Sequence, residues 1–343
     1  MGKATVFVDS GGPAAGAVRS GTAKGWAGGP LRVPGPSLLN PGLRQVEEQA
    51  LAWARRTGLL SAHTAEQAGR ERQVAMAAHV WPWAEPGRLA ELARLTLWMF
   101  AVDDDSDSGP GDASAGTGRE LEAMTRALGA WAGTVPVSAA PAVRVLGEVV
   151  PRVTGAMGPA WGDRFRRHLV AWIRTNQDTI RFRTDREVPS PEAYIAWRRV
   201  SGATGWCFDL IEYAQESELP ERIWFSPACR RLREAAADVI GWTNDLFSVE
   251  KELSSGETTN LVLILRHHQG LTLREAVDET RLWHARRVDA LRIATRDLYA
   301  TALATDLTSA QLAAVCQYAD GVHAWVRGFL DFSLASARYS APG

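Results

Sequence analysis

The sequence predicts an all-α protein, a single-domain helical bundle. From Pro41 to near the end of the chain, apolar residues recur at the three- and four-residue spacing of amphipathic helices. No stretch shows the sustained alternation and hairpin turns of β-strands. Short Gly- and Pro-containing breaks separate the helical segments, and no long linker divides them, so we expect one large domain for the 343 residues.

The helical spacing predicts these elements in chain order: 46–60, 66–80, 89–107, 117–133, 140–155, 158–183, 191–216, 228–254, 258–269, 272–304 and 308–335. Residues 1–37 are rich in Gly, Ala, Ser and Pro and show little apolar periodicity, so we predict a disordered N-terminal extension. A cap over the active site is the alternative for this extension. Residues 38–340 then form the folded domain.

The composition excludes several classes of protein. The 38 basic and 39 acidic residues nearly cancel, so the overall charge favours neither nucleic acid nor an anionic membrane surface as a partner. The three cysteines are widely spaced, which favours neither a disulfide framework nor a zinc site. No apolar run approaches the roughly 20 residues of a membrane helix, and the N-terminus lacks the apolar core of a signal peptide. We therefore expect a cytoplasmic protein.

The segment NDLFSVEKE places three oxygen-bearing side chains at positions i, i+4 and i+8, which share one face of a helix. They are the carboxamide of Asn244, the hydroxyl of Ser248 and the carboxylate of Glu252. The same face continues backward through Ile240 and Ala237, so these polar groups occupy the side that would otherwise enter the core. An ordinary amphipathic helix is the alternative, but Asn and Ser are poor helix formers without a role. Oxygen ligands on a buried face favour a hard cation such as Mg²⁺.

A second acidic cluster, DDDSD, ends one of the predicted helices. Asp103 and Asp107 are four residues apart, with Asp104 beside them, and they continue an apolar helix face. A solvated helix end is one alternative, and a calcium loop is another. A calcium loop from Asp103 would need Gly and Glu where the chain has Ser108 and Ser114. Carboxylates that faced the first cluster without a cation would repel each other, so the two clusters together favour a metal centre.

Both clusters resemble the motifs of the bacterial class I terpene synthases. The family pattern of an aromatic residue followed by D-D-x-x-D is matched by Phe100, Asp103, Asp104 and Asp107. The pattern N-D-x-x-S-x-x-x-E is matched by Asn244, Asp245, Ser248 and Glu252. The resemblance covers about residues 40–339. It implies an all-α bundle of the class I terpenoid synthase type, with the active site in its central cavity.

Arg198 stands 46 residues before Asn244 and resembles the diphosphate-sensing arginine of the family. Adjacent arginines such as Arg198 and Arg199 are more often surface charges, but small residues follow this pair. An interior Gly costs a helix about 1 kcal/mol against Ala, a cost that a break beside a pocket would explain. The resemblance gives Ser201 and Gly202 the places that help to trigger ionisation.

The resemblance also supplies the other groups that would bind diphosphate. Arg338 and Tyr339 resemble the terminal Arg-Tyr pair of the family, and Lys251 lies near the Asn244 face of its helix. Aromatic residues near the motifs are expected to line the cavity, where rings stabilise a carbocation by up to about 2 kcal/mol. The expected lining rings are Phe100, Trp206, Phe208, Trp325 and Phe332.

These features imply a terpene cyclase in which three Mg²⁺ ions bridge the two clusters and the diphosphate of a linear isoprenoid. Farnesyl diphosphate is the expected substrate, a sesquiterpene and pyrophosphate are the products, and a diterpene cyclase that uses geranylgeranyl diphosphate is the alternative. A prenyltransferase would carry a second aspartate-rich cluster in place of Asn244 and Ser248. A non-catalytic diphosphate-binding relative is the more distant alternative. Deprotonation and water capture both remain as the closing step, and a homodimer is common among relatives.

Overall fold

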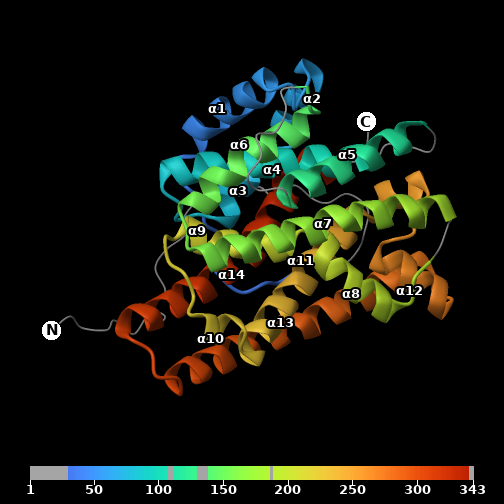
Figure 1. Cartoon of the computed structure of the whole chain (residues 1–343). Helices are drawn as coiled ribbons and strands as arrows, with labels where there is room; N and C mark the ends of the chain where they lie inside the picture. The colour runs from blue at the N-terminus through green and yellow to red at the C-terminus, as the bar shows by residue number, and fades with distance from the viewer. Residues whose placement is uncertain (1–29, 107–111, 130–137, 186–187, 340–343) are drawn as a thin grey trace, which may run out of the picture.

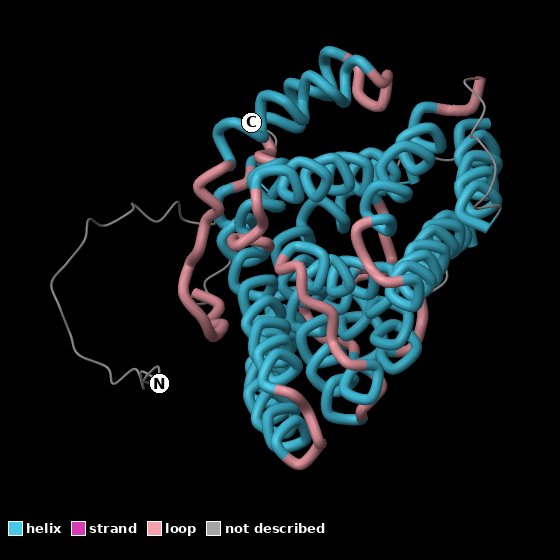
Figure 2. The backbone as a smooth tube through the Cα atoms, turned by 60° about the vertical axis from the view of Figure 1, so that its left-hand side comes forward, coloured by secondary structure: helices cyan, strands magenta, loops and turns pink. Residues whose placement is uncertain are grey.

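The computed structural model describes residues 30–106, 112–129, 138–185 and 188–339, which form helices joined by loops and contain no strand (Figures 1 and 2). The predicted all-α fold is confirmed. Most of the expected extension, residues 1–29, lies outside the described residues. Residues 30–37 are non-helical, and Val33 packs against the core. None of the described helices combines the length and apolar character that crossing a membrane requires.

The helices in the first half of the chain are α1 (Leu43–Arg56), α2 (Ala62–Arg70), α3 (Gln73–Val80), α4 (Pro86–Ser106), α5 (Asp112–Gly129), α6 (Pro141–Gly155) and α7 (Pro159–Asp185). Those in the second half are α8 (Pro191–Ser201), α9 (Thr204–Ala214), α10 (Glu221–Trp224), α11 (Pro227–Ser255), α12 (Leu261–Gln269), α13 (Leu273–Leu303) and α14 (Ser309–Ala335). A 3₁₀ turn, η1 (Ala337–Tyr339), follows α14.

Two long helices, α4 and α11, organise the bundle. α11 packs most extensively against α13 and also contacts α8, α12 and α14, whereas α4 packs against α1, α3, α6, α7 and α9. In Figure 1, α1 and α2 lie at the top of the bundle and α13 lies at the opposite side. α14 closes the bundle against α3, where a Cβ at Gly328 would lie 2.5 Å from the His79 carbonyl oxygen. Glycine therefore allows this close approach of the two helices.

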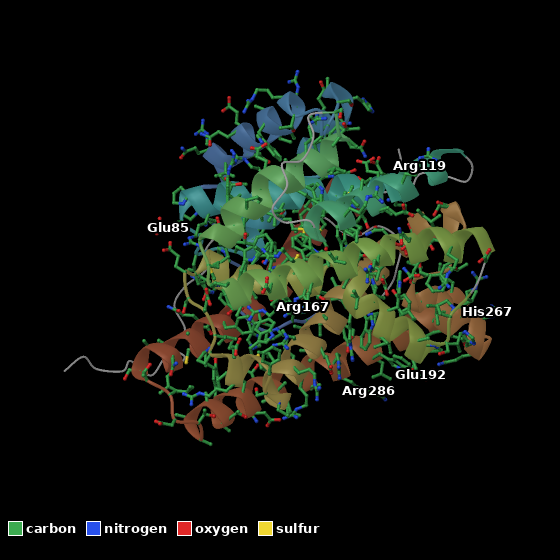
Figure 3. All side chains as sticks on the ribbon, in the orientation of Figure 1. Glu85, Arg119, Arg167, Glu192, His267 and Arg286 are labelled. Atoms are coloured by element: carbon green, nitrogen blue, oxygen red, sulfur yellow. The ribbon has the colours of Figure 1, made fainter. Side chains whose placement is uncertain are left out.

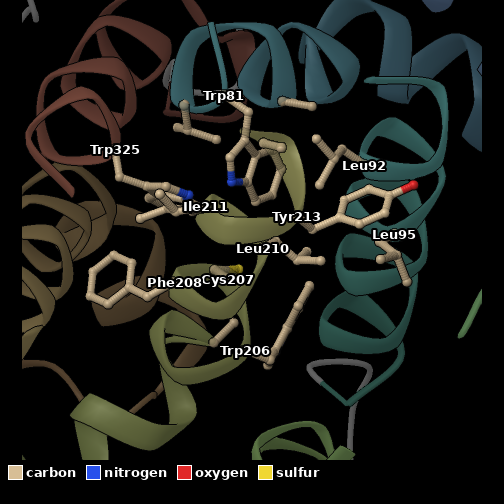
Figure 4. Close-up of a cluster of buried hydrophobic side chains, with 14 of the residues drawn as sticks. Trp81, Leu92, Leu95, Trp206, Cys207, Phe208, Leu210, Ile211, Tyr213 and Trp325 are labelled. Carbon is tan, nitrogen blue, oxygen red and sulfur yellow. The ribbon is translucent and has the colours of Figure 1, made fainter. Parts of the chain in front are cut away.

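The core is rich in aromatic side chains. Trp325 of α14 meets Trp81 edge to face, with 5.5 Å between ring centroids, and Phe208 of α9 packs on its other side (Figure 4). Burying a large apolar side chain contributes roughly 1.5–3 kcal/mol, so this cluster strongly stabilises the junction of α9 and α14. Charged side chains such as Glu192 and Arg286 are exposed at the outside of the bundle (Figure 3).

Two predicted helices are each split in two. The segment 66–80 forms α2 and α3, because Arg72 adopts a left-handed conformation with φ 57°. The segment 191–216 forms α8 and α9, with Ala203 at φ 62° between them. A single left-handed residue ends one helix and lets the next begin without interrupting the apolar periodicity, which explains why the spacing alone predicted continuous helices. The four-residue helix α10 was not predicted.

Local capping fixes the starts of the helices that carry the polar motifs. Ser190 accepts a hydrogen bond from the Ala193 amide to begin α8, and Ser226 accepts one from the Cys229 amide to begin α11. Proline occupies the first turn of both helices, where its missing N–H has no helical partner to lose. Asn260 caps α12 in the same way.

Candidate active site

A cavity of about 120 Å³ lies between α4, α7, the α8–α9 break, α11 and the C-terminal segment. A second, more polar cavity of about 150 Å³ adjoins it and shares six lining residues with it: Asp103, Arg198, Ser201, Asn244, Lys251 and Glu252. The first cavity has apolar walls away from these shared residues, formed by Met76, Met99, Phe100, Trp172, Ile240, Trp325 and Phe329. The combined space is therefore polar at one end and apolar at the other.

The α11 wall of the site, defined as Asn244, Ser248 and Glu252, is held by an extensive hydrogen-bond network. The Asn244 Oδ1 atom accepts from Arg198 at 2.6 Å, and its Nδ2 atom donates to the Tyr339 hydroxyl at 2.9 Å. Glu252 accepts from the Asn260 amide at 2.7 Å. Burial, followed by the negative charge of Asp245, raises the pKa of Glu252 to about 7. These carboxamide, hydroxyl and carboxylate oxygens therefore share one helix face, on which Ser248 is buried and Asn244 and Glu252 are partly exposed.

Asp245, beside this wall, is completely enclosed. Its Oδ2 atom accepts from the Tyr194 hydroxyl at 2.6 Å and from the Leu261 amide at 3.1 Å. Its Oδ1 atom accepts from Arg198 at 3.0 Å. Burial is the largest influence and raises the pKa of Asp245, against the lowering effects of Arg198 and Tyr194. Asp245 thus connects α8, α11 and α12 and points away from the cavity space.

Arg198 reaches the cavity because α8 lies very close to α11. A Cβ at Gly241 would lie 3.2 Å from the Arg198 Cγ atom, so the glycine makes room for the arginine stem. Burial opposes the charge of Arg198, but interactions with Tyr194 and Asp245 raise its pKa above the usual range. Its Nε atom and the Ser201 Oγ atom are buried without a hydrogen-bond partner among the described residues. Buried polar atoms that face a cavity without a protein partner are typical of a site that binds a polar ligand.

The α4 wall of the site, defined as Asp103 and Asp104, is more open. Their side chains are 47% and 40% exposed. Arg338 contacts Asp104 at 2.7 Å and Asp103 at 3.4 Å, and it also contacts Glu71 at 3.3 Å. Asp107, the third predicted metal ligand of this cluster, lies outside the described residues.

The donor set fits a hard divalent cation. Glu71, Asp103 and Asp104 gather around the Arg338 guanidinium, so three carboxylates lie together beside the cavity. The described residues include no group of three or more His, Cys, Asp and Glu side chains placed to hold a metal by themselves. The α11 wall instead offers mixed oxygen donors, and Mg²⁺ bound by few protein ligands takes phosphate oxygens as well.

The structure brings most of the predicted site residues together. Those that line one or both cavities are Phe100, Asp103, Arg198, Ser201, Gly202, Asn244, Ser248, Lys251, Glu252, Trp325, Arg338 and Tyr339. Trp206, Phe208 and Phe332 are buried but do not line either cavity. They pack behind its walls, as where Phe332 contacts Phe100 and Trp206 contacts Trp172. Proximity to a motif in sequence does not show which face of a helix carries the ring.

Sequence reasoning missed several residues of the site. Trp172 of α7 lines the cavity and donates from its indole nitrogen to the Ser201 carbonyl at 3.1 Å. Tyr194 and Glu71 act on motif residues through hydrogen bonds and ion pairs. A buried tryptophan or a single glutamate gives no signal in one sequence, because its partners lie on distant elements.

Comparisons with known proteins identify the class of enzyme. Residues 94–290 match the sequence model of terpene synthase family 2, C-terminal metal binding. The match spans more than half of the chain, which therefore belongs to the terpene synthase family. The protein is a bacterial class I terpene synthase and hence a lyase.

Individual relatives match almost the whole chain. Pristinol synthase from Streptomyces pristinaespiralis is 31% identical over 91% of this chain and 85% of its own length. (+)-T-muurolol synthase from Roseiflexus castenholzii, which is described as farnesyl diphosphate cyclizing, is 30% identical over 90% of this chain and 93% of its own. The solved structure of a cucumene synthase variant is 26% identical with a TM-score of 0.79, and the match covers 90% of this chain and all of that one.

Proposed function

We propose that this enzyme uses Mg²⁺ to ionise farnesyl diphosphate, cyclises the resulting carbocation to a sesquiterpene and releases pyrophosphate. The observation that carries the proposal is the two-ended cavity. Oxygen donors of the α4 and α11 walls and the cations Arg198, Lys251 and Arg338 gather at one end, and aromatic side chains line the other. A diphosphate joined to a hydrocarbon chain has the same division of polarity. The description of the relative from Roseiflexus castenholzii supports the C15 substrate.

The polar end would hold the metal and the leaving group. Asp103, Asp104 and Asp107 on one side and the α11 wall on the other would hold three Mg²⁺ ions. When bound, the metal acts as a Lewis acid that stabilises the charge of the leaving diphosphate. The donors that would bind the diphosphate oxygens are Arg198, Lys251, Arg338 and Tyr339. Arginine forks suit this task because they offer paired donors to phosphate oxygens.

The α8–α9 break would position the trigger for ionisation. Gly202 and Ala203 interrupt the helix beside Arg198, and Ser201 and Gly202 line the cavity at this point. The Arg198 Nε and Ser201 Oγ atoms, for which the described residues offer no hydrogen-bond partner, are donors that a diphosphate would satisfy. Binding there would favour departure of the diphosphate, because donors that are already placed stabilise developing charge without reorganising.

The apolar end would then guide the hydrocarbon. Phe100, Trp172, Trp325 and Phe329 present rings to this space. A ring face attracts a desolvated cation by up to about 2 kcal/mol, and the apolar walls exclude water that would quench it. Substrate folding against these rings would select the cyclisation path.

The direct test is to incubate the purified enzyme with C10, C15 and C20 allylic diphosphates, with and without Mg²⁺. Gas chromatography with mass detection would identify the products, and a phosphate assay would follow pyrophosphate release. We expect a cyclic product from the C15 substrate only when the metal is present. A cyclic product from C20 alone would show a diterpene cyclase instead, and absence of both product and pyrophosphate with every substrate would refute the proposal.

A further inference from the structure

Glu71 is a buried carboxylate at the junction of α2 and α3, outside every motif that the sequence reveals. Its side chain is 10% exposed and accepts hydrogen bonds from Gln67 at 2.8 Å and from Gln73 at 2.9 Å. Burial alone would raise the pKa of Glu71, but these bonds and the charge of Arg338 outweigh it and lower the pKa. The left-handed conformation of Arg72 turns the chain next to this residue. Glu71 is therefore a fixed negative charge at the edge of the active site.

The junction binds the C-terminal segment at two points. The Ser336 hydroxyl donates to the Glu71 carbonyl oxygen at 2.6 Å, and Arg338 donates to the Glu71 carboxylate at 3.3 Å. Arg338 and Glu71 are 267 residues apart in sequence. The guanidinium also lies 5.0 Å from the centre of the Phe100 ring, which lines the cavity. Glu71 itself does not line either cavity, so it can act on a ligand only through Arg338.

The three carboxylates around Arg338 differ in what else they can bind. Asp103 lines both cavities, and both aspartates are nearly half exposed, whereas Glu71 is buried and accepts hydrogen bonds from two glutamines. A cation bound by Asp103 and Asp104 would compete with Arg338 for their oxygens. Arg338 would then lose both aspartates, including the Asp104 oxygen that shares its Nη1 atom, and keep Glu71.

We propose that Glu71 is a positioning residue that keeps Arg338 at the cavity mouth while Asp103 and Asp104 exchange Arg338 for metal. This inference rests on the proposed metal and diphosphate function of the same site. The Arg338 Nη1 atom is shared by Glu71 and Asp104, each at 3.3 Å, whereas Nη2 donates to Asp104 at 2.7 Å and to Asp103 at 3.4 Å. When metal takes the aspartate oxygens, Glu71 retains Nη1, and Nη2 can turn to a diphosphate oxygen. Without this fixed partner, Arg338 remains bound to the aspartates and opposes the metal, and pyrophosphate binding weakens.

A double-mutant cycle of Glu71→Gln and Arg338→Gln tests the proposal by binding rather than by turnover. Inorganic pyrophosphate would be titrated calorimetrically into each of the four proteins at a fixed Mg²⁺ concentration. In the wild-type background, Glu71→Gln should weaken pyrophosphate binding about 10-fold, the loss expected for one charge-assisted hydrogen bond. In the Arg338→Gln background, it should have no further effect, because the residue through which it acts is absent.

Glu91→Gln is the matched control. Glu91 is similarly buried, at 14% exposure, and pairs with Arg94 and Arg152 away from the cavities. This variant should bind pyrophosphate as the wild type does. If Glu71→Gln does not fold, as judged by circular dichroism, Glu71→Asp keeps the charge and replaces it in the same cycle, with a smaller weakening expected.

The possible outcomes separate this inference from the proposed function. An equal loss of affinity in both backgrounds would mean that Glu71 only supports the α2–α3 junction, and no loss in either would mean that Arg338 does not need it. Either result overturns the inference and leaves the proposed function standing, provided that the wild type binds pyrophosphate with Mg²⁺. A wild type that binds no pyrophosphate would overturn both.

Discussion

The two walls that carry the oxygen donors are built in opposite ways. The α11 wall runs from the middle of a long helix to its last turn, and its neighbour Asp245 is only 1% exposed and bonded to groups from α8 and α12. The α4 wall lies near the end of the described part of its helix, where Asp103 and Asp104 are nearly half exposed and both bind Arg338. One wall is fixed before any ligand arrives, whereas the other has partners that a ligand can replace.

Elementary electrostatics explains the contrast between the exposed aspartates of the α4 wall and the buried Asp245 of α11. Negative charge at the C-terminal end of a helix opposes the helix dipole, at a cost of roughly 0.3–1 kcal/mol per group. Positive charge beside Asp103 and Asp104 is therefore stabilising, and Arg338 supplies some of it. A carboxylate buried in the middle of α11 is instead stable only with every oxygen satisfied, which explains the dense network around Asp245.

The largest expected effect is on turnover. Glu252→Ala, and likewise Asn244→Ala, should lower the turnover rate by about 10³-fold or more, because no neighbouring side chain can replace a lost oxygen donor of the α11 wall. Asp104→Asn should lower it only about 10-fold, because exposed donors and water can compensate there. Steady-state kinetics would measure both, and unchanged melting temperatures would show that the fold survives. An Asp104→Asn enzyme as inactive as Glu252→Ala would refute the contrast between the walls.

The next effect concerns the support behind the fixed wall. His284 of α13 is buried, and its Nε2 atom lies 3.0 Å from the hydroxyl oxygen of Thr243. Thr243 directly precedes Asn244 in α11. Burial, with a smaller effect of the Arg281 charge, lowers the pKa of His284 to about 4. The unfolded chain therefore binds more protons between about pH 4 and 6.5, so the contribution of this residue is complete above pH 6.5 and is lost as the pH falls towards 4.

The loss would amount to about 3 kcal/mol in the free energy of unfolding at pH 4. Urea unfolding at pH 4.5 and pH 7 should show a larger decrease for the wild type than for His284→Gln, which cannot titrate. Equal decreases would show that His284 already titrates normally in the folded protein and that this part of the bundle is less tightly closed than the contacts indicate.

Tyr194→Phe tests the support of the α11 wall separately from its donors. The substitution removes the hydroxyl that binds Asp245 and leaves every donor of the α11 wall in place. Asp245 would lose its 2.6 Å hydrogen bond from Tyr194, and Arg198 would have to balance more of the negative charge of Asp245. We expect the Mg²⁺ concentration for half-maximal activity to rise by roughly 10- to 100-fold. Tyr213→Phe, at a buried tyrosine outside both cavities, is the control. An equal rise in the control would attribute the effect to general loosening.

The residues of the α11 wall were easier to predict from the sequence than those of the α4 wall. The positions of Asn244, Ser248 and Glu252 follow from helical periodicity alone, since one continuous helix determines their common face. The helix class of the fold was predictable for the same reason. The α8–α9 break was only partly visible, because Gly202 signals a cost but the turn itself occurs at Ala203.

The α4 wall could not be completed from the sequence. Its partner Arg338 was identified by resemblance, but Glu71 reaches it through a tertiary contact that no local pattern encodes. The lining rings were equally hard to assign. Trp325 and Trp206 both lie near motif residues, yet only the rotation of each helix determines that the first faces the cavity and the second faces the core.

The smallest expected effect tests that last distinction and concerns product choice rather than rate. Trp325→Phe replaces a lining indole with a weaker cation-binding ring, and Trp206→Phe makes the same change in a ring behind the wall. Because cation–π attraction reaches about 2 kcal/mol, the ratio of products should change several-fold in Trp325→Phe. Trp206→Phe should lower stability with little change in that ratio. Gas chromatography of both product mixtures would decide, and a larger shift from Trp206→Phe would show that the carbocation is guided by a different surface.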